Sequence, residues 1–253
     1  MPVEFGKPMK KDSKIESDNG KDNNVKKEFT LSIETGIRGG SIALLKHTTV
    51  IDSRLGQSEI SRSEDVLEGI RSILLENNIE KTQIKLIVFS RGPGSFTGIR
   101  IGVVLAQGLS KSLGCDYLGF SVLEAMADNV QAGKKVIAAV NFGKNQVCWQ
   151  FLRVGATSES RNLRLPEPRI SAALSFIREI EYYEFDYLIL QNHLYNNLLH
   201  SITKSVISNR LHVNATDNLA AMLGKYAEKL ENKNQLNQWE ERVKPIYVEN
   251  LQK

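Results

Sequence analysis

The stretch Ser90-Arg91-Gly92-Pro93-Gly94-Ser95-Phe96-Thr97-Gly98-Ile99-Arg100-Ile101-Gly102 joins two apolar segments of different character. Before it, residues 84–89 form a short run rich in branched side chains, which is typical of a strand covered on both faces. After it, residues 97–113 have the apolar spacing of a helix. The glycines and the proline fit neither element, because proline lacks an amide donor and glycine adopts backbone angles that other residues avoid. The sequence therefore predicts a buried strand, a tight loop and a helix.

Small residues recur at every fourth position along the predicted helix, namely Gly98, Gly102, Ala106 and Ser110. Residues four apart share one face of a helix, so another element could approach the backbone closely along this face. The other faces carry mainly apolar side chains, which is typical of a buried helix. Two interpretations remain open: the small face packs on the chain's own sheet, or the helix also packs against a partner.

The residues of the loop match only one of three kinds of chemical site that contain such loops. A nucleotide-binding P-loop needs a lysine after its last glycine, but Ile99 and Arg100 follow Gly98. A hydrolase nucleophile elbow needs glycine two positions before the serine, where Ser95 has Pro93. Anion binding by loop amides at the start of the helix remains open, since free amides and the helix dipole both favour negative charge. The candidate anion or nucleotide site comprises Gly92, Gly94, Ser95, Thr97 and Arg100.

The segment 92–102 closely resembles the signature of the TsaB (YeaZ) family of bacterial tRNA-modification proteins. Two further segments fit the resemblance. Phe29-Thr30-Leu31-Ser32-Ile33-Glu34-Thr35 is similar to the first strand of that family, and Pro245-Ile246-Tyr247-Val248 is similar to its closing Pro-x-Tyr segment. The similarity extends over roughly residues 28 to 250, and it is denser in the first half.

The resemblance implies an actin-like, RNase-H-like α/β fold of two similar lobes, each with a mixed sheet and packed helices. It also implies a non-catalytic role beside a TsaD-like transferase and a TsaE-like ATPase. Such proteins together place a threonylcarbamoyl group on the adenosine next to the anticodon of tRNAs that read codons starting with A. In this family the first two helices contact TsaD, and the same surface can form a homodimer. Carried over to the helices at about 59–77 and 97–113, the partner-binding residues would be Val66, Ile70, Ile73, Gly98, Gly102, Ala106 and Ser110.

The runner-up function is a small ATP-dependent enzyme, because the actin-like fold also hosts kinases and ATPases. Such enzymes hold magnesium and phosphate between two glycine turns that each carry an acidic residue. The corresponding turns here are Glu34-Thr35-Gly36 and Asn141-Phe142-Gly143, so the second carboxylate is missing. TsaB-like proteins usually have Asp at position 34 and Asp-Ala-Arg at positions 141–143. We therefore expect no intrinsic cofactor, with ATP or ADP entering only at a junction of the complex, and Glu34 satisfied by nearby turn amides.

Composition divides the chain into a tail and two lobes. Residues 1–27 carry seven lysines and five carboxylates, so they contribute +2 to the net charge of +4, and their few apolar groups indicate a disordered tail. We expect an N-terminal, partner-binding lobe at 28–132 and a C-terminal lobe at 133–253. The chain of 253 residues has no apolar run of the roughly 18 residues that a membrane helix requires. Two distant cysteines, Cys115 and Cys148, favour buried free thiols and a cytoplasmic location.

Neither metal chemistry nor direct RNA binding is expected. The histidines have no pair at the spacing that would place two imidazoles around zinc; they are His47, His193, His200 and His212. Lysine and arginine are spread among carboxylates, without an aromatic stacking platform. We therefore expect the isolated chain to bind tRNA weakly and in a strongly salt-dependent way, and to reach tRNA through the complex.

Overall fold

The computed structural model describes residues 26–37, 39–56, 63–143, 145–154, 167–204, 212–216 and 218–232. The predicted tail, the proposed helix start at 59–62 and the closing segment 245–248 lie outside these residues. Within them, no helix combines the length and apolar character that a membrane span requires.

The first sheet is a mixed sheet of β1 (Phe29–Glu34), β2 (Ser41–Lys46), β3 (Thr49–Leu55), β4 (Ile84–Gly92) and β5 (Asp116–Ser121). Its order is β3-β2-β1-β4-β5. The first three strands form an antiparallel meander, and β4 and β5 then add in parallel. The buried β4 matches the strand that the apolar run predicts.

The second sheet repeats this arrangement with β6 (Lys135–Asn141), β7 (Gln146–Arg153), β8 (Arg169–Ala172), β9 (Tyr187–Gln191) and β10 (His212–Thr216). Its order is β10-β9-β6-β7-β8, in which β6, β7 and β8 form the meander and β9 and β10 are parallel additions. The predicted actin-like α/β architecture of two similar lobes is therefore confirmed. The limits of 28–132 and 133–253 stay a prediction.

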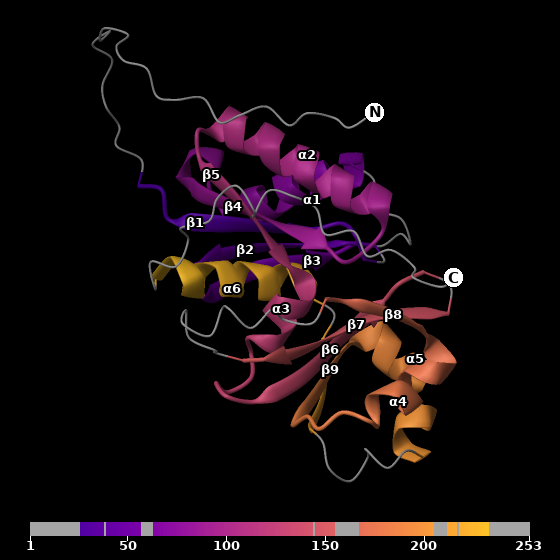
Figure 1. The fold of residues 1–253 in the computed structure, drawn as a ribbon. Helices are drawn as coiled ribbons and strands as arrows, with labels where there is room; N and C mark the ends of the chain where they lie inside the picture. Colours follow the sequence, from indigo (N-terminus) through magenta and orange to yellow (C-terminus); the bar gives the residue numbers. More distant parts are fainter. Residues whose placement is uncertain are drawn as a thin grey trace, which may run out of the picture.

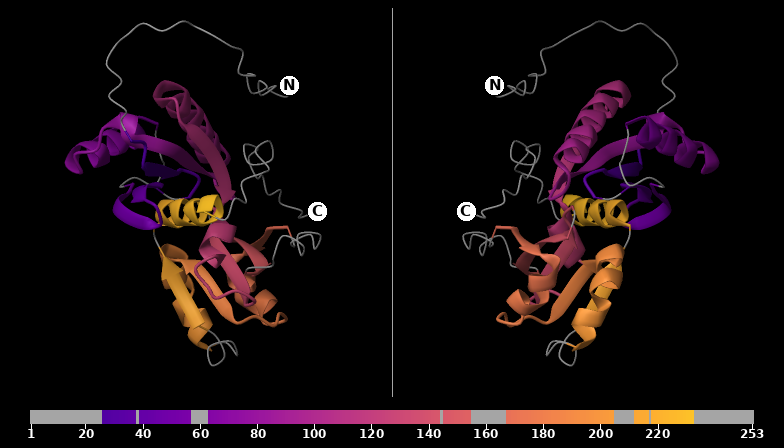
Figure 2. Two further views of the ribbon diagram at one scale, coloured as in Figure 1. Left: turned by 90° about the vertical axis from the view of Figure 1, so that its left-hand side faces the viewer. Right: turned by 90° about the vertical axis from the view of Figure 1, so that its right-hand side faces the viewer.

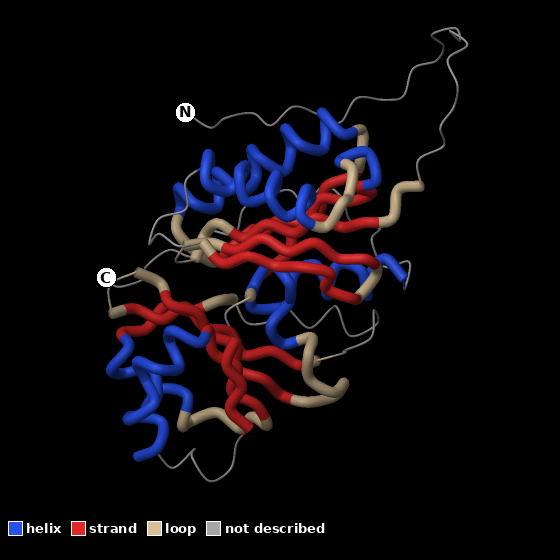
Figure 3. Tube along the Cα trace, turned by 180° about the vertical axis from the view of Figure 1, so that it is seen from behind, coloured by secondary structure: helices blue, strands red, loops and turns tan. Residues whose placement is uncertain are grey.

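Helices cover both sheets in layers (Figures 1 and 3). The outer face of the first sheet carries α1 (Ser63–Glu76) and α2 (Phe96–Leu113), and the outer face of the second carries α4 (Ala173–Ile180) and α5 (Asn192–Lys204). Between the sheets lie α3 (Val122–Ala127) and α6 (Leu219–Asn232). A short 3-10 turn, η1 (Lys81–Gln83), precedes β4. One hydrophobic cluster joins side chains of both sheets with α3 and α6.

Helix α6 packs against the first sheet although it comes last among the described elements. Its Gly224 allows this approach, because a Cβ at that position would lie 2.4 Å from a methyl carbon of Leu45. The fully buried Glu228 accepts a hydrogen bond from the Thr30 hydroxyl at 2.5 Å and pairs with Lys85 at 3.1 Å. A carboxylate with two such partners fastens α6 to β1 and β4.

Replacing Glu228 by alanine is expected to lower the free energy of unfolding by about 3 kcal/mol, because the Lys85 charge would lose its buried partner. The control is Glu184→Ala, whose carboxylate pairs with Lys135 but is 95% exposed, so we expect a loss below about 1 kcal/mol. Urea unfolding followed by circular dichroism measures both. Equal losses would show that the buried pair does not fasten α6.

Both cysteines of the chain are free. Cys148 is buried among apolar side chains, and this burial raises the pKa of its thiol to about 12. Cys115 is only half-buried, so the prediction of a buried free thiol is confirmed for Cys148 alone.

Candidate interaction site

The loop between β4 and α2 is fixed against the turn that follows β1. The Ser95 amide donates to the Gly36 carbonyl at 2.6 Å, and the Ser95 hydroxyl caps α2 by accepting from the Gly98 amide at 3.3 Å. A Cβ at Gly94 would lie 2.7 Å from the Gly36 carbonyl oxygen, so only glycine fits there. The junction therefore holds the start of α2 in one position relative to β1.

The predicted anion site does not form an open cradle of amides. Gly92 and Gly94 are buried, and the Gly92 amide donates to the Ser90 hydroxyl at 3.1 Å. Thr97 and Arg100 are exposed, and the Arg100 guanidinium lies 3.7 Å from the centroid of the Phe96 ring. The structure thus separates the glycines of this site from its arginine, and anion binding there stays a prediction.

The small face of α2 packs against the chain's own first lobe. A Cβ at Gly98 would lie 2.1 Å from the Thr35 carbonyl oxygen, and one at Gly102 would lie 2.6 Å from the Thr35 hydroxyl. That hydroxyl donates to the Gly98 carbonyl at 2.7 Å. Ala106 is fully buried, and Ser110 donates to the Cys115 carbonyl at 2.5 Å. Of the two interpretations left open by the sequence, packing on the chain itself accounts for the small face.

The predicted contact residues of α1 are also inside the fold. Val66, Ile70 and Ile73 belong to the core beneath the helix, together with Ala106 of α2. All seven residues predicted to bind a partner are buried in this structure, which corrects their placement: they are the inner faces of α1 and α2. Any partner that lies on these helices would meet their outer faces instead.

The outer faces of α1 and α2 carry exposed apolar side chains. Leu75 is 72% exposed and Val104 is 66% exposed, and Leu67 and Phe96 are about half exposed. Both helices lie on the side of the first sheet that faces away from the second lobe (Figure 2). We call these four residues the outer helix face.

The electrostatics of the first glycine turn are dominated by burial. Glu34 is 1% exposed, and its Oε1 accepts from the amides of Gly36 at 2.6 Å and Ile37 at 3.0 Å. Burial raises the pKa of Glu34 to about 8, and the two amide hydrogen bonds act in the opposite direction. The predicted satisfaction of Glu34 by turn amides is confirmed.

The second turn brings no carboxylate to complement Glu34. The Asn141 amide donates to the Gln191 side chain at 3.1 Å, and the Phe142 amide donates to the Gln146 carbonyl at 2.9 Å. Across the described ranges, no group of three or more His, Cys, Asp or Glu side chains could hold a metal ion. His47 and His200 are exposed, and His193 is partly buried.

Comparisons with known proteins agree with the family resemblance. The family model described as "TsaD: tRNA N6-adenosine threonylcarbamoyltransferase" matches residues 59–237. The TsaB protein of Buchnera aphidicola subsp. Schizaphis graminum is 34% identical over 130 residues, which cover 50% of this chain and 61% of that protein. The TsaB protein of Escherichia coli K12 is 31% identical over 122 residues, which cover 47% of this chain and 52% of that protein. The chain thus spans between half and two thirds of the length of these relatives.

Solved structures show the same fold. YeaZ from Pseudomonas aeruginosa superposes with a TM-score of 0.59 at 20% sequence identity. The superposition covers 87% of this chain and 100% of the YeaZ chain. Component A of the (R)-2-hydroxyglutaryl-CoA dehydratase of Acidaminococcus fermentans superposes with a TM-score of 0.52 at 9% identity, over 80% and 98% of the two chains. The resemblance to the TsaB (YeaZ) family is confirmed by the sequence matches, and the structural likenesses add the fold.

Proposed function

Because the chain belongs to the family described by the TsaD model, and is similar within it to TsaB proteins, we propose that it is a non-catalytic partner subunit. Its partner would be a TsaD-like transferase that forms threonylcarbamoyladenosine next to the anticodon of tRNA. In this role the chain binds and supports the transferase and leaves the group transfer to it.

The observation that carries the proposal is the outer helix face. Four large apolar side chains are exposed on two helices whose inner faces are fixed by packing, so the surface is presented without further ordering. Exposed charged residues lie on the same two helices, with Glu64, Asp65 and Glu68 on α1 and Arg100 on α2. Exposed apolar side chains accompanied by charged ones are the usual composition of a protein interface.

The two glycine turns support a role without catalysis. Glu34 is buried and accepts hydrogen bonds from amides of its own turn, and Asn141 cannot supply the charge that binds magnesium and triphosphate. In the proposed complex, a nucleotide is held at a junction with a TsaE-like ATPase, and tRNA is held mainly by the transferase. The complex acts in the cytoplasm, and the outer helix face joins two copies of the chain when the transferase is absent.

The decisive experiment is co-purification of the chain with the TsaD-like protein of its host, followed by threonylcarbamoyl transfer to tRNA. Val104→Glu is expected to weaken the complex at least about tenfold, because it places a charge in the apolar centre of the interface. Transfer should fall with the loss of complex. The matched control is Leu199→Glu, which adds the same charge at an exposed leucine of α5 and should change neither result.

Circular dichroism should first show that both variants are folded. If Val104→Glu binds the transferase as tightly as the unmodified chain does, the outer helix face is not the contact. If the purified chain alone hydrolyses ATP or modifies tRNA, the non-catalytic role is wrong and the ATP-dependent enzyme replaces it.

A further inference from the structure

Strand β3 forms one edge of the first sheet. The strand order is β3-β2-β1-β4-β5, so among the described strands β3 has a neighbour only on its β2 side. The Gly56 amide, just after β3, donates to the Gly40 carbonyl on that side at 3.0 Å. Because the backbone groups of alternate residues point to the same side of a strand, the peptide groups of Ser53 and Leu55 point away from β2. This edge can therefore form hydrogen bonds with a further strand.

The β3 edge carries exposed apolar side chains. Leu55 is 52% exposed, and Ile51 is 42% exposed. Ile51 is the extra residue of a β-bulge between Val50 and Asp52, so no residue of β2 lies directly opposite it. Apolar side chains beside unpaired backbone groups favour the addition of a strand from another chain.

Two opposite charges lie between these apolar residues. Arg54 donates to Asp52 at 3.0 Å and to Glu76 of α1 at 2.5 Å. Asp52 also accepts from the Asn77 side chain at 2.8 Å and from the Ser53 amide at 2.6 Å. The hydrogen bonds from Asn77 and Arg54 hold the pKa of Asp52 below its usual range, so this carboxyl is charged at neutral pH. The edge amide of Ser53 is thus held by a side chain, which can release it when another strand offers a carbonyl.

From these observations we propose that the β3 edges of two copies of the chain pair antiparallel about a two-fold axis at Ser53. In this register, Asp52 of each copy lies opposite Arg54 of the other copy. Ile51 of each copy lies opposite Leu55 of the other. The two Ser53 residues exchange amide-to-carbonyl hydrogen bonds at the centre. The two five-stranded sheets then form one continuous sheet.

The charges select this register. A shift of the axis by one residue brings Asp52 opposite Asp52 or Arg54 opposite Arg54, and like charges directly opposite each other destabilise a strand pair. With the axis at Ser53, the two Asp52–Arg54 pairs fall at non-hydrogen-bonded positions, where side chains on neighbouring strands are closest. A guanidinium has five donors, so Arg54 can keep Glu76 while it binds a second carboxylate.

The same pattern selects a second copy as the occupant. Around Ser53 the sequence reads apolar, acidic, serine, basic, apolar from Ile51 to Leu55. Such an order is complementary to its own reverse, so each favourable contact occurs twice in a two-fold interface. The β3 edge is distinct from the outer helix face, and this contact goes beyond the proposed function.

Sedimentation of the purified chain tests the interface. The background is Val104→Glu, which removes association through the outer helix face, and we expect this protein still to form a dimer. Adding Leu55→Lys is expected to raise the Kd of the dimer at least about tenfold, because an edge lysine opposes strand pairing. Circular dichroism should first show that the variant is folded.

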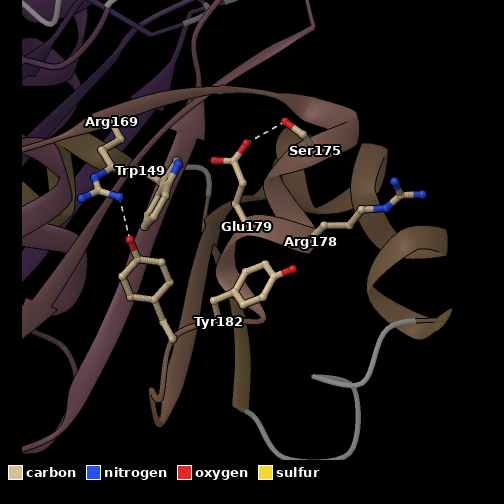
Figure 4. Close-up of a pocket in the computed structure, with 7 residues that line it drawn as sticks. Trp149, Arg169, Ser175, Arg178, Glu179 and Tyr182 are labelled. Carbon is tan, nitrogen blue, oxygen red and sulfur yellow. Dashed lines mark hydrogen bonds between the residues drawn. The ribbon is translucent and has the colours of Figure 1, made fainter.

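The matched control changes an exposed leucine of the second lobe. Leu174, near the start of α4, is 89% exposed. The same helix supplies Ser175, Arg178 and Glu179 to the pocket in Figure 4. Leu174→Lys adds the same charge as Leu55→Lys and should leave the Kd of the dimer unchanged.

A disulfide across the two-fold axis tests the register. In a Cys115→Ser background, Ser53→Cys is expected to form a disulfide between two copies under mild oxidation. Directly opposite, hydrogen-bonded residues have Cα atoms about 5.5 Å apart, which a disulfide can span. In the same register two copies of Thr49 lie about 27 Å apart, so Thr49→Cys should react at least about tenfold more slowly.

Three outcomes would overturn the proposal. One is a Val104→Glu protein that stays monomeric, and another is a dimer that tolerates Leu55→Lys as well as Leu174→Lys. The third is equal cross-linking at Ser53 and Thr49. No transferase is present in these experiments, so their failure leaves the proposed function untouched.

Discussion

Replacing Gly98 by alanine is expected to lower the free energy of unfolding by about 3 kcal/mol or more, because the new Cβ would lie 2.1 Å from the Thr35 carbonyl oxygen. The obstructing atom belongs to the backbone, so no side-chain rotation relieves the contact. A shift of α2 away from Thr35 would also cost free energy, because it would break two hydrogen bonds. The Thr35 hydroxyl donates to the Gly98 carbonyl at 2.7 Å, and the Ser95 amide donates to the Gly36 carbonyl at 2.6 Å. Urea unfolding followed by circular dichroism measures the loss.

Gly108 in the same helix is the matched control. A Cβ at Gly108 has nothing within 4 Å, and alanine is the better helix former by about 1 kcal/mol. Gly108→Ala is therefore expected to stabilise the protein slightly, opposite in sign to Gly98→Ala. If Gly98→Ala proves as stable as Gly108→Ala, α2 does not pack on Thr35 as described.

The stability of the protein is expected to fall as the pH rises from about 5 to about 8. Burial raises the pKa of Glu34 from its ordinary 4.5 to about 8, so the folded protein keeps a proton that the unfolded chain releases. The contribution of Glu34 is fully present below the unfolded pKa and is lost as the pH rises through the folded pKa. A difference of this size corresponds to at most about 5 kcal/mol.

Glu34→Gln isolates this effect, because its amide oxygen can still accept from Gly36 and Ile37 but the side chain does not ionise. Urea midpoints at pH 5, 6.5, 8 and 9 should fall for the unmodified protein and stay nearly level for the variant. The pKa values of Glu28, Asp52 and Asp186 are lowered by hydrogen bonds and cations, so these groups act at lower pH. Parallel profiles for the two proteins would contradict the raised pKa of Glu34.

Much of the first lobe and the hairpin of β6 and β7 can be predicted from the sequence, because these elements carry strong local patterns. Strand β4, the glycine loop and α2 follow from an apolar run, a proline and a four-residue repeat, and the structure places α2 within one residue of the predicted 97–113. The hairpin of β6 and β7 follows in the same way from two apolar segments around a turn. Each of these elements carries its own pattern, independently of the rest of the chain.

Elements with a narrow apolar stripe cannot be predicted in the same way. Helix α5 buries only Leu194, Leu198 and Ile202, and the polar residues between them hide the helical period. Strand β10 is short and alternates polar with small apolar residues, so it has little propensity of its own. The tertiary structure stabilises both elements by packing them against β9.

The position of the partner surface could not be predicted from the sequence for a different reason. Periodicity identified Gly98 and Gly102 as positions of close approach, which is correct. Periodicity does not say whether the neighbour belongs to the same chain, and here it is Thr35. The outer helix face became visible only when the exposure of Leu75 and Val104 was known.

The return of α6 to the first sheet also has a consequence for how the protein is made. A ribosome releases the strands of the first sheet early, but the helix that covers their inner face ends at Asn232. Until that helix emerges, Leu45 and other apolar side chains of the nascent first lobe face water on one side. The N-terminal lobe therefore completes its folding only after nearly the whole second sheet has been synthesised, so the two lobes mature together rather than in sequence.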